Sequence, residues 1–426
     1  MKKANKFLFR SLLFISLAGF SACDSKEDLP DDNKEPEEPT EAITNLSREG
    51  IANCYIVQAQ GIYMIKADNQ FNLGEGLPVP PKITPVKAGL IWQSEKGLIK
   101  NVELIDEEEG KFIKFEVNKA EGNVLLAAYN AKDEIEWSWH IWMPKEAPYS
   151  FETETGYEVM NMNLGALDNV AGSPSSYGLL YQWGRKDPFP AAGELTGDVN
   201  TLSAHMYDMD NNEVLLKNSS WTDTENNTLA YSISNPTVVL SNYSQYFTNR
   251  DWLKTGSGDD SLWGNPKGFQ RDETTNDYLN KGVKTCYDPS PLGWRVPPVD
   301  VFSNFTTNGG YSWDFADFNI ADINGDRVLD LDDYNYGWHF YVNPNSALYF
   351  PAASRFDGSY AMLMGSMTGL WGNYWSNSPS DNMVGGGFCS LAFQVKDQNG
   401  GEMITVSPSA ASSRADAFSI RCVRDN

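Results

Sequence analysis

An acidic stretch in the second half of the chain has the spacing of a calcium-binding loop. Counted from the first aspartate of DINGDRVLDLDD (residues 322–333), positions 1, 3, 5, 7, 9 and 12 each present an oxygen atom. They belong to Asp322, Asn324, Asp326, Val328 (through its backbone carbonyl), Asp330 and Asp333. Calcium takes roughly six to eight hard oxygen ligands, and loops of the EF-hand type supply them from these positions. Because carboxylates this close otherwise repel one another, we expect a structural calcium ion here.

Two features depart from such a loop, and a second interpretation stays open. Position 6 is Arg327 rather than glycine, although the turn there favours a positive φ angle. The stretch resembles the calcium loop of dockerin modules, but the paired second loop of a dockerin is missing, so cohesin docking is not expected. The alternative is a solvated acidic turn whose aspartates cap LDDYNYGWHF as the start of a helix. A second acidic group, Asp208, Asp210 and Glu213, lacks the full spacing.

No grouping of histidines, nucleophiles or cysteines has the spacing of an active site. The three histidines are His140, in the alternating stretch WSWHIW, and His205 and His339, which lack a paired Cys or His at ligand spacing. No Gly-x-Ser-x-Gly motif supports a Ser-His-Asp triad. Carboxylate pairs are always found among 57 acidic residues, so their number does not indicate glycoside hydrolysis. We therefore expect a protein that is not an enzyme.

The overall charge limits the partners that the protein can bind. The 426 residues include 57 Asp and Glu against 33 Lys and Arg, which gives a net charge of −24. Such a chain does not neutralise the phosphates of a nucleic acid, and it offers no basic face to an anionic membrane. With 13 Trp, 35 Gly and 22 Pro, the composition instead favours strands and turns, in about two domains.

The N-terminus has the pattern of a lipoprotein signal peptide. MKKANKFLFR supplies positive charge, an apolar run follows, and the small residues Ser21 and Ala22 precede Cys23. The apolar run is too short to be a good membrane-spanning helix. The resemblance implies that residues 1–22 are removed and that Cys23 carries lipid in the outer membrane. The alternative is an ordinary secreted protein that is cleaved elsewhere.

The segment after Cys23 is acidic and rich in proline. Residues 23–43, CDSKEDLPDDNKEPEEPTEAI, show no apolar periodicity, so they predict a flexible tether. An acidic run directly after a lipidated cysteine resembles the surface-export signal of Bacteroidetes lipoproteins. This resemblance implies a location at the cell surface, and a plain solvated linker is the alternative.

Residues 44–148 consist of short apolar stretches separated by turn signals. KFIKFEV and EIEWSWHIW alternate between apolar and polar residues, and AEGN and NAKDE separate neighbouring stretches. Regular short strands with turns between them predict an all-β sandwich of immunoglobulin-like size.

Residues 149–426 contain four short blocks set among polar insertions. They are MNMNLGALD (160–168), YGLLYQWGRKDPFP (177–190), YDPSPLGWRVP (287–297) and FPAASRFDG with GLWGNYWSNSP (350–379). In this order the blocks resemble the Fibrobacter succinogenes major paralogous domain, a module of Bacteroidetes surface lipoproteins. The resemblance implies a β-rich, irregular α+β fold similar to C-type lectins and to the formylglycine-generating enzyme. It implies long loops, paired N- and C-terminal strands, and insertions at 191–280 and 315–338.

The resemblance also bears on the cysteines and on one group of aromatic residues. The family usually has Cys where this chain has Ser290. In an oxidising envelope we expect a disulfide between Cys286 and Cys422, with Cys389 as the rival partner and Cys54 as a buried thiol. In the Gly-rich stretch GLWGNYWSN, three aromatic residues are candidates either for ligand contact or for packing: Trp371, Tyr374 and Trp375.

These observations predict non-catalytic binding at the cell surface. The roles expected are adhesion, capture of a glycan or host ligand, or the tip of a fimbria-like assembly. One alternative is a structural subunit of such an assembly that exchanges strands with a neighbouring subunit. The other alternative is an oxidase of the formylglycine-generating type, which needs a close pair of reactive cysteines.

Overall fold

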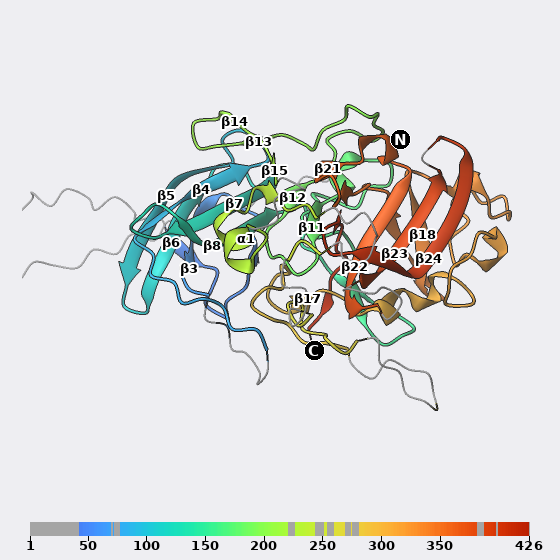
Figure 1. Cartoon of the computed structure of the whole chain (residues 1–426), viewed down its shortest axis with the longest axis horizontal. Coiled ribbons are helices and arrows are strands. Elements are labelled where there is room, and N and C mark those ends of the chain that lie inside the picture. The colour runs from blue at the N-terminus through green and yellow to red at the C-terminus, as the bar shows by residue number, and fades with distance from the viewer. Residues whose placement is uncertain are drawn as a thin grey trace, which may run out of the picture. The chain divides into compact units, whose positions relative to one another are not determined.

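The computed structural model describes residues 42–69, 71, 77–219, 226–242, 251–253, 260–268, 274, 281–380, 387–397 and 399–425. The chain divides into two compact units, residues 1–41 and 42–426, and every described residue belongs to the second unit. The predicted signal peptide (1–22), Cys23 and nearly all of the predicted tether (23–43) therefore lie outside the described residues. The regular secondary structure of the described residues is mainly β-strand (Figure 1).

The first sheet has four strands. In spatial order they are β1 (Ile43–Asn45), β3 (Gly61–Lys66), β6 (Gly110–Val117) and β5 (Ile99–Glu107). The alternation of KFIKFEV is confirmed in β6, where Phe115 and Val117 are buried while Lys114 and Glu116 remain half-buried. A bulge interrupts β5 between Lys100 and Glu103, and it raises the local twist of that edge strand.

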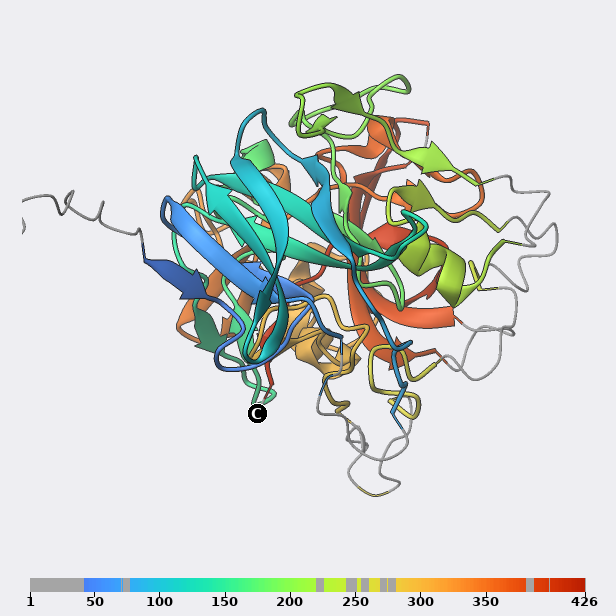
Figure 2. The same ribbon diagram turned by 90° about the vertical axis from the view of Figure 1, so that its left-hand side faces the viewer.

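The second sheet has six strands. In spatial order they are β14 (Glu213–Val214), β13 (Met206–Tyr207), β4 (Lys87–Gln93), β7 (Gly122–Tyr129), β8 (Ile135–Met143) and β2 (Cys54–Ile56). Figure 2 shows the cyan strands of the two sheets toward the viewer. Strands β13 and β14 come from the predicted insertion at 191–280, and Tyr207 of β13 pairs with Gln93 of β4. Part of that insertion thus extends a sheet rather than forming only a loop.

One hydrophobic core joins the two sheets and continues into the later chain. It contains Phe115 of the first sheet and Leu126 of the second, together with Trp183 and Phe418. The opposite face of the second sheet carries Asn123 and Trp142 and is covered by later residues: Trp142 donates to the carbonyl of Ala166 at 2.7 Å, and Asn123 to that of Gly165 at 2.9 Å. This double coverage explains why β7 and β8 are buried along nearly their whole length. The predicted boundary between residues 148 and 149 is therefore crossed by a shared core.

The later chain begins and ends in the same sheet. Its strands, in spatial order, are β17 (Trp294–Arg295), β26 (Val423–Arg424), β10 (Glu158–Met160) and β9 (Ser150–Glu152). A second sheet has the order β12 (Phe189–Pro190), β11 (Leu179–Gln182), β25 (Ala417–Phe418), β20 (Phe356–Asp357) and β21 (Met362–Leu363). A short parallel pair consists of β15 (Lys217–Asn218) and β16 (Val238–Val239).

Longer strands enclose a second core that is rich in aromatic residues. An antiparallel sheet has the order β22 (Trp371–Pro379), β23 (Gly387–Lys396) and β24 (Glu402–Ser413), seen side by side in Figure 1. A hairpin consists of β18 (Gly337–Asn343) and β19 (Ser346–Pro351). Between them Phe305 stacks on Phe340 with centroids 4.3 Å apart, and its ring meets Phe350 edge to face at 5.0 Å. Stacked and edge-to-face rings add to the stabilisation that area burial alone provides.

Helices in the described ranges are few and short. They are η1 (Pro174–Ser176), α1 (Leu229–Ser234), η2 (Val299–Phe305), η3 (Phe315–Asp317), η4 (Leu331–Asp333) and η5 (Gly365–Met367), of which only α1 is an α-helix. Asp330 caps η4 through a capping box with Asp333. The alternative interpretation, in which aspartates cap LDDYNYGWHF as the start of a helix, is met only over this single turn, because Gly337 begins strand β18 and pairs with Pro351 of β19. The prediction of a β-rich fold is confirmed.

Candidate functional site

Residues 306–318 form a closed surface loop, called here the aromatic loop. At its base Thr306 bridges to Phe318, and the amide of Thr307 donates to the carbonyl of Asp317 at 2.8 Å. At its tip Gly309 has a φ of 66°, which glycine adopts without the cost that a Cβ would add. The Asn308 side chain accepts from the amide of Gly310 at 2.8 Å. Hydrogen bonds within the loop therefore hold both its base and its tip.

Two aromatic side chains project from the aromatic loop into solvent. Tyr311 is 51% exposed and Trp313 is 74% exposed, and their ring centroids lie 5.8 Å apart at an interplanar angle of 68°. Ser312 between them is buried, exchanges two backbone hydrogen bonds with Val406 of β24, and donates from its hydroxyl to Asp317 at 2.7 Å. Because side chains alternate along extended backbone, anchoring Ser312 inward directs both neighbours outward.

The acidic stretch predicted to bind calcium folds as a second surface loop. One carboxylate oxygen of Asp322 accepts from the amide of Gly325 at 2.6 Å, and the other accepts from Arg327 at 2.8 Å. Asn324 accepts from the amide of Asp326, and Asp326 from that of Val328, each at 2.8 Å. Arg327 has a φ of 70°, so the positive φ expected at position 6 is confirmed, with the strain expected of a residue other than glycine.

The carboxylates of the acidic loop serve its own backbone in this arrangement. Asp333 is 1% exposed and accepts from the amide of Ile323 at 2.8 Å, which closes the loop across its ends. In the described part of the chain, no three Asp, Glu, His or Cys side chains are grouped so that they could hold a metal ion. Calcium binding by Asp322, Asn324, Asp326, Val328, Asp330 and Asp333 therefore stays a prediction.

The two loops are anchored on the same tryptophan. Phe315 of the aromatic loop lies edge to face on Trp338, with centroids 6.0 Å apart. Tyr334, which directly follows the acidic loop, lies edge to face on the same ring at 4.7 Å. Trp338 is fully buried in the second core, so each loop has a rigid base there.

The predicted ligand contacts at Trp371, Tyr374 and Trp375 are wrong, because these side chains are buried. Tyr374 and Trp375 are fully buried and Trp371 is 8% exposed. Each polar atom serves the backbone of a distant segment: Trp375 donates to the carbonyl of Tyr181 and Trp371 to that of Lys396, both at 2.7 Å. The Tyr374 hydroxyl donates to Pro351 at 2.6 Å. Rings in these positions pack the core and cannot stack on a ligand.

The predicted disulfide between Cys286 and Cys422 is also wrong. Both are free thiols, as is Cys54, and all three are buried. The Cys286 thiol faces the carbonyl of Pro78 at 3.3 Å, whereas the Cys422 thiol faces the hydroxyl of Ser290 at 3.2 Å. Burial raises the pKa of Cys286 and of Cys422 to about 12. They are therefore protonated and poorly nucleophilic at neutral pH. The side chain of the rival partner, Cys389, lies outside the described residues.

A buried charged cluster joins β8 to the block YGLLYQWGRKDPFP. Lys186 donates to Asp187 at 2.7 Å and to the Ser138 hydroxyl at 2.5 Å, and its ammonium lies 4.6 Å from the centre of the Trp137 ring. The side chains of Lys186 and Asp187 are 2% and 4% exposed. Burial lowers the pKa of Lys186. A serine beside a lysine is a reactive pairing in open sites, but this pair is closed to substrate and serves as an anchor.

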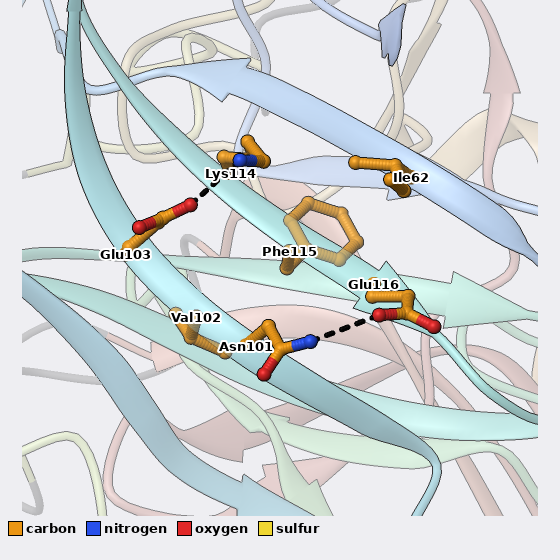
Figure 3. A pocket seen from close by; sticks show the side chains of 7 residues that line it. All are labelled: Ile62, Asn101, Val102, Glu103, Lys114, Phe115 and Glu116. Atoms are coloured by element: carbon orange, nitrogen blue, oxygen red, sulfur yellow. Dashed lines mark hydrogen bonds and ion pairs between the residues drawn. The ribbon is translucent and has the colours of Figure 1, made fainter. Parts of the chain in front are cut away.

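A pocket of about 350 Å³ lies on the first sheet beside the bulge of β5 (Figure 3). It is lined by Ile62, Asn101, Val102, Glu103, Lys114, Phe115 and Glu116. The polar groups at its rim are paired: Lys114 with Glu103 at 2.7 Å, and Asn101 with Glu116 at 2.9 Å. The ionisable side chains of the lining are held in surface ion pairs, Lys114 with Glu103 and Glu116 with Lys100, and no histidine is among the seven residues.

Comparison of the chain with protein-family models, curated proteins and solved structures finds no match. A search of the described residues also finds no helix long and apolar enough to cross a membrane. Sequence reasoning missed Tyr311 and Trp313. The available signal was the stretch GGYSWDF, in which two aromatics flank a serine between a glycine pair and an aspartate.

Proposed function

We propose that this protein is a lipid-anchored cell-surface protein whose body binds an external ligand without transforming it. The observation that carries the proposal is the exposed pair Tyr311 and Trp313, presented on a loop fixed by hydrogen bonds to a β-rich body. Large aromatics left in solvent on a rigid support are typical of binding surfaces. The anchor in the outer membrane is the acylated Cys23, as the leader sequence indicates.

The architecture that we propose has two parts. Residues 44–148 form an immunoglobulin-like sandwich, which is supported by two sheets around one core. Residues 149–426 form a C-type-lectin-like module, which is supported by the pairing of β10 with β26 near the two ends of that stretch. The irregular connections between short strands also favour such a module.

Binding is favoured over the oxidase alternative by the state of the cysteines. Oxidase chemistry of the formylglycine-generating type needs reactive thiolates, whereas burial raises the pKa of Cys286 and Cys422 to about 12. The thiols of these two residues also face different partners, Pro78 and Ser290.

Calcium binding by the acidic loop is part of the proposal, with a structural role for the ion. Two observations support it: Arg327 at position 6 has a φ of 70°, and the candidate oxygens belong to a single twelve-residue segment. An ion would replace some of the amide partners that Asp322 and Asp326 now have.

The location and the binding can be tested together in a bacterium with two membranes. The whole chain should incorporate a labelled fatty acid, fractionate with the outer membrane and be degraded when intact cells are treated with protease. The Cys23→Ala variant should lose the label and the membrane association. Cells displaying the chain should adhere to an immobilised panel of glycans and host proteins, and cells displaying no chain should not. Labelled protein that is protected from protease, or cells that adhere to nothing, would contradict the proposal.

The second candidate is a structural subunit that exchanges strands with a neighbouring subunit. It is favoured by the short length and edge position of strand β1. This strand is only three residues long, pairs in parallel with β3 at the edge of the sheet, and directly follows the predicted tether. A short edge strand has few hydrogen bonds to break before a neighbour's strand replaces it. Purified chain that forms concentration-dependent polymers in light scattering, without any ligand, would favour this candidate.

A further inference from the structure

We propose that Tyr311 and Trp313 form a stacking subsite for a neutral glycan. The proposal rests on the binding function argued above and names the ligand class of that site. The two rings are 51% and 74% exposed. By contrast, tryptophans of the core such as Trp183, Trp338 and Trp375 are fully buried.

The geometry of the ring pair suits a sugar ring. Their centroids are 5.8 Å apart and their planes meet at 68°, so one ring offers a flat face while the other forms a wall beside it. A pyranose has a face of C–H groups that can lie on an aromatic ring, and its rim can rest against a second ring. The electron-rich aromatic face attracts the polarised C–H groups.

The aromatic loop also carries acceptors for sugar hydroxyls. Asp314 is exposed and follows Trp313 directly, and one of its oxygens accepts from the amide of Ala316 at 3.0 Å. A carboxylate has about four acceptor positions, so the group retains capacity for ligand hydroxyls. Thr307 is also exposed, and its hydroxyl lies 3.2 Å from Asp317.

Charge favours a neutral ligand over a polyanion. The chain has a net charge of −24, and the aromatic loop itself carries Asp314 and Asp317 without a basic residue between 306 and 318. Sulfated or phosphorylated chains would meet repulsion here, since like charges raise the cost of close approach.

The exposed area of the two rings suits a small ligand better than a protein–protein interface. Taking about 250 Å² for a complete aromatic side chain, the two rings expose on the order of 300 Å². A stable protein interface covers about 800 Å² on each partner, so the pair alone falls well short of one. One or two sugar units fit the available surface.

The rigidity of the aromatic loop lowers the entropic cost of binding. Ser312 is tied to Val406 through both backbone groups and to Asp317 through its hydroxyl, and Thr306 bridges to Phe318 at the base. Side chains that are already ordered lose less freedom when a ligand binds.

The experiment is affinity electrophoresis of the whole chain, solubilised in detergent, in native gels that contain a soluble mannan, xylan, galactan or β-glucan. We expect at least one polysaccharide to retard the wild type, in a manner insensitive to salt, since the interaction is not ionic. Trp313→Ala and Tyr311→Ala should each weaken binding by about tenfold or more. Trp313→Phe, which retains a ring, should keep most of it.

The matched control is Tyr360→Ala, since Tyr360 is 59% exposed but lies outside the aromatic loop. It should bind as the wild type does. EDTA should leave binding intact if stacking dominates, and binding that EDTA abolishes would place the ligand on a metal and overturn the proposal. Thermal denaturation of every variant shows that the fold is retained.

The outcomes separate this proposal from the proposed function. If a polysaccharide binds equally to the wild type, Trp313→Ala and Tyr311→Ala, the aromatic loop is not the subsite, although the protein still binds a glycan. If no neutral polysaccharide retards the chain while displayed cells adhere to a host protein or an anionic glycan, the ligand class is wrong and the binding function stands. If neither assay detects a ligand, both proposals fail.

Discussion

Two stretches of similar residue types, YSW at 311–313 and WGNYW at 371–375, have opposite positions in the molecule. Tyr311 and Trp313 are 51% and 74% exposed, whereas Tyr374 and Trp375 are fully buried. Both stretches are extended, and each makes backbone hydrogen bonds to a segment distant in sequence. Ser312 pairs with Val406, and the amide of Trp375 donates to the carbonyl of Ser419 at 3.0 Å.

The difference lies in what covers the side chains. In β22, Trp375 stacks on Phe418 with centroids 4.2 Å apart, and Tyr374 meets Phe350 edge to face at 5.2 Å, so chain covers both faces of the strand. The segment around Ser312 instead adds to the outer edge of β24, with only its serine turned inward. A tryptophan in a Gly-rich context therefore does not indicate a ligand platform by its neighbours alone.

The largest expected contrast is between two tryptophan truncations. Trp375→Ala should cost about 3–5 kcal/mol of the free energy of unfolding, because it leaves a cavity and an unpaired carbonyl at Tyr181. Trp313→Ala should change it by no more than about 0.5 kcal/mol. Urea denaturation followed by circular dichroism measures both. Similar losses in the two variants would remove the distinction between buried and exposed stretches.

A second contrast compares a buried ion pair with a surface pair. Lys186→Met strands the carboxylate of Asp187 in the core and should cost about 3–5 kcal/mol, whereas the double variant Lys186→Met/Asp187→Leu should cost less. The matched surface variant is Lys114→Ala, which removes the partner of Glu103 and should cost at most about 1 kcal/mol. A double variant less stable than the single variant would contradict the buried pair as the source of the loss.

The third prediction concerns the loss of stability at acidic pH that the buried His140 causes. Burial lowers the pKa of His140 from 6.5 to about 3, so between these pH values the unfolded state binds a proton that the folded state excludes. The contribution of neutral His140 to the free energy of unfolding is complete above pH 6.5 and falls as the pH drops, by roughly 2–3 kcal/mol at pH 4.5. His140→Gln should flatten this part of the stability profile, measured by denaturation between pH 7 and 4.5. An unchanged slope would contradict the assignment.

The smallest expected effect is that of calcium on the acidic loop. At ten times the dissociation constant, an ion bound only to the folded state adds about 1.4 kcal/mol. The midpoint of thermal denaturation should rise when calcium replaces EDTA, and Asp326→Ala should abolish the rise. Asp210→Ala, in the acidic group that lacks the spacing, is the matched control and should retain it. The absence of a shift in the wild type would exclude a calcium site.

Local patterns in the sequence predicted strands better than they predicted which distant segments bury the side chains of those strands. The alternation of KFIKFEV predicted β6 correctly, because a two-residue period depends only on neighbouring side chains. The positive φ at Arg327 was also predictable, from position within a twelve-residue loop. The burial of Trp375 depends on Phe418 and Ser419, more than 40 residues later, and no local pattern reports that contact.

The cysteines illustrate the same limit. Cys286 and Cys422 were assigned to each other because such a bond would tie the end of the module to the YDPSPLGWRVP block, yet Cys286 faces Pro78 and Cys422 faces Ser290. The covered faces of β7 and β8 were not predicted either, since their apolar runs read equally well as the single core of a free-standing sandwich. Tyr311 and Trp313 were missed because exposure follows from the lack of a covering segment.

The place of Arg421 has a consequence for how the chain folds. This fully buried side chain donates to Asn163 at 2.9 Å, to the carbonyl of Asn161 at 2.8 Å and to that of Tyr349 at 2.7 Å. These partners lie 258, 260 and 72 residues earlier in the chain, so the hydrogen bonds form only after long loops have closed. We therefore expect slow folding, because the entropy of closing those loops is lost before the buried arginine stabilises the core.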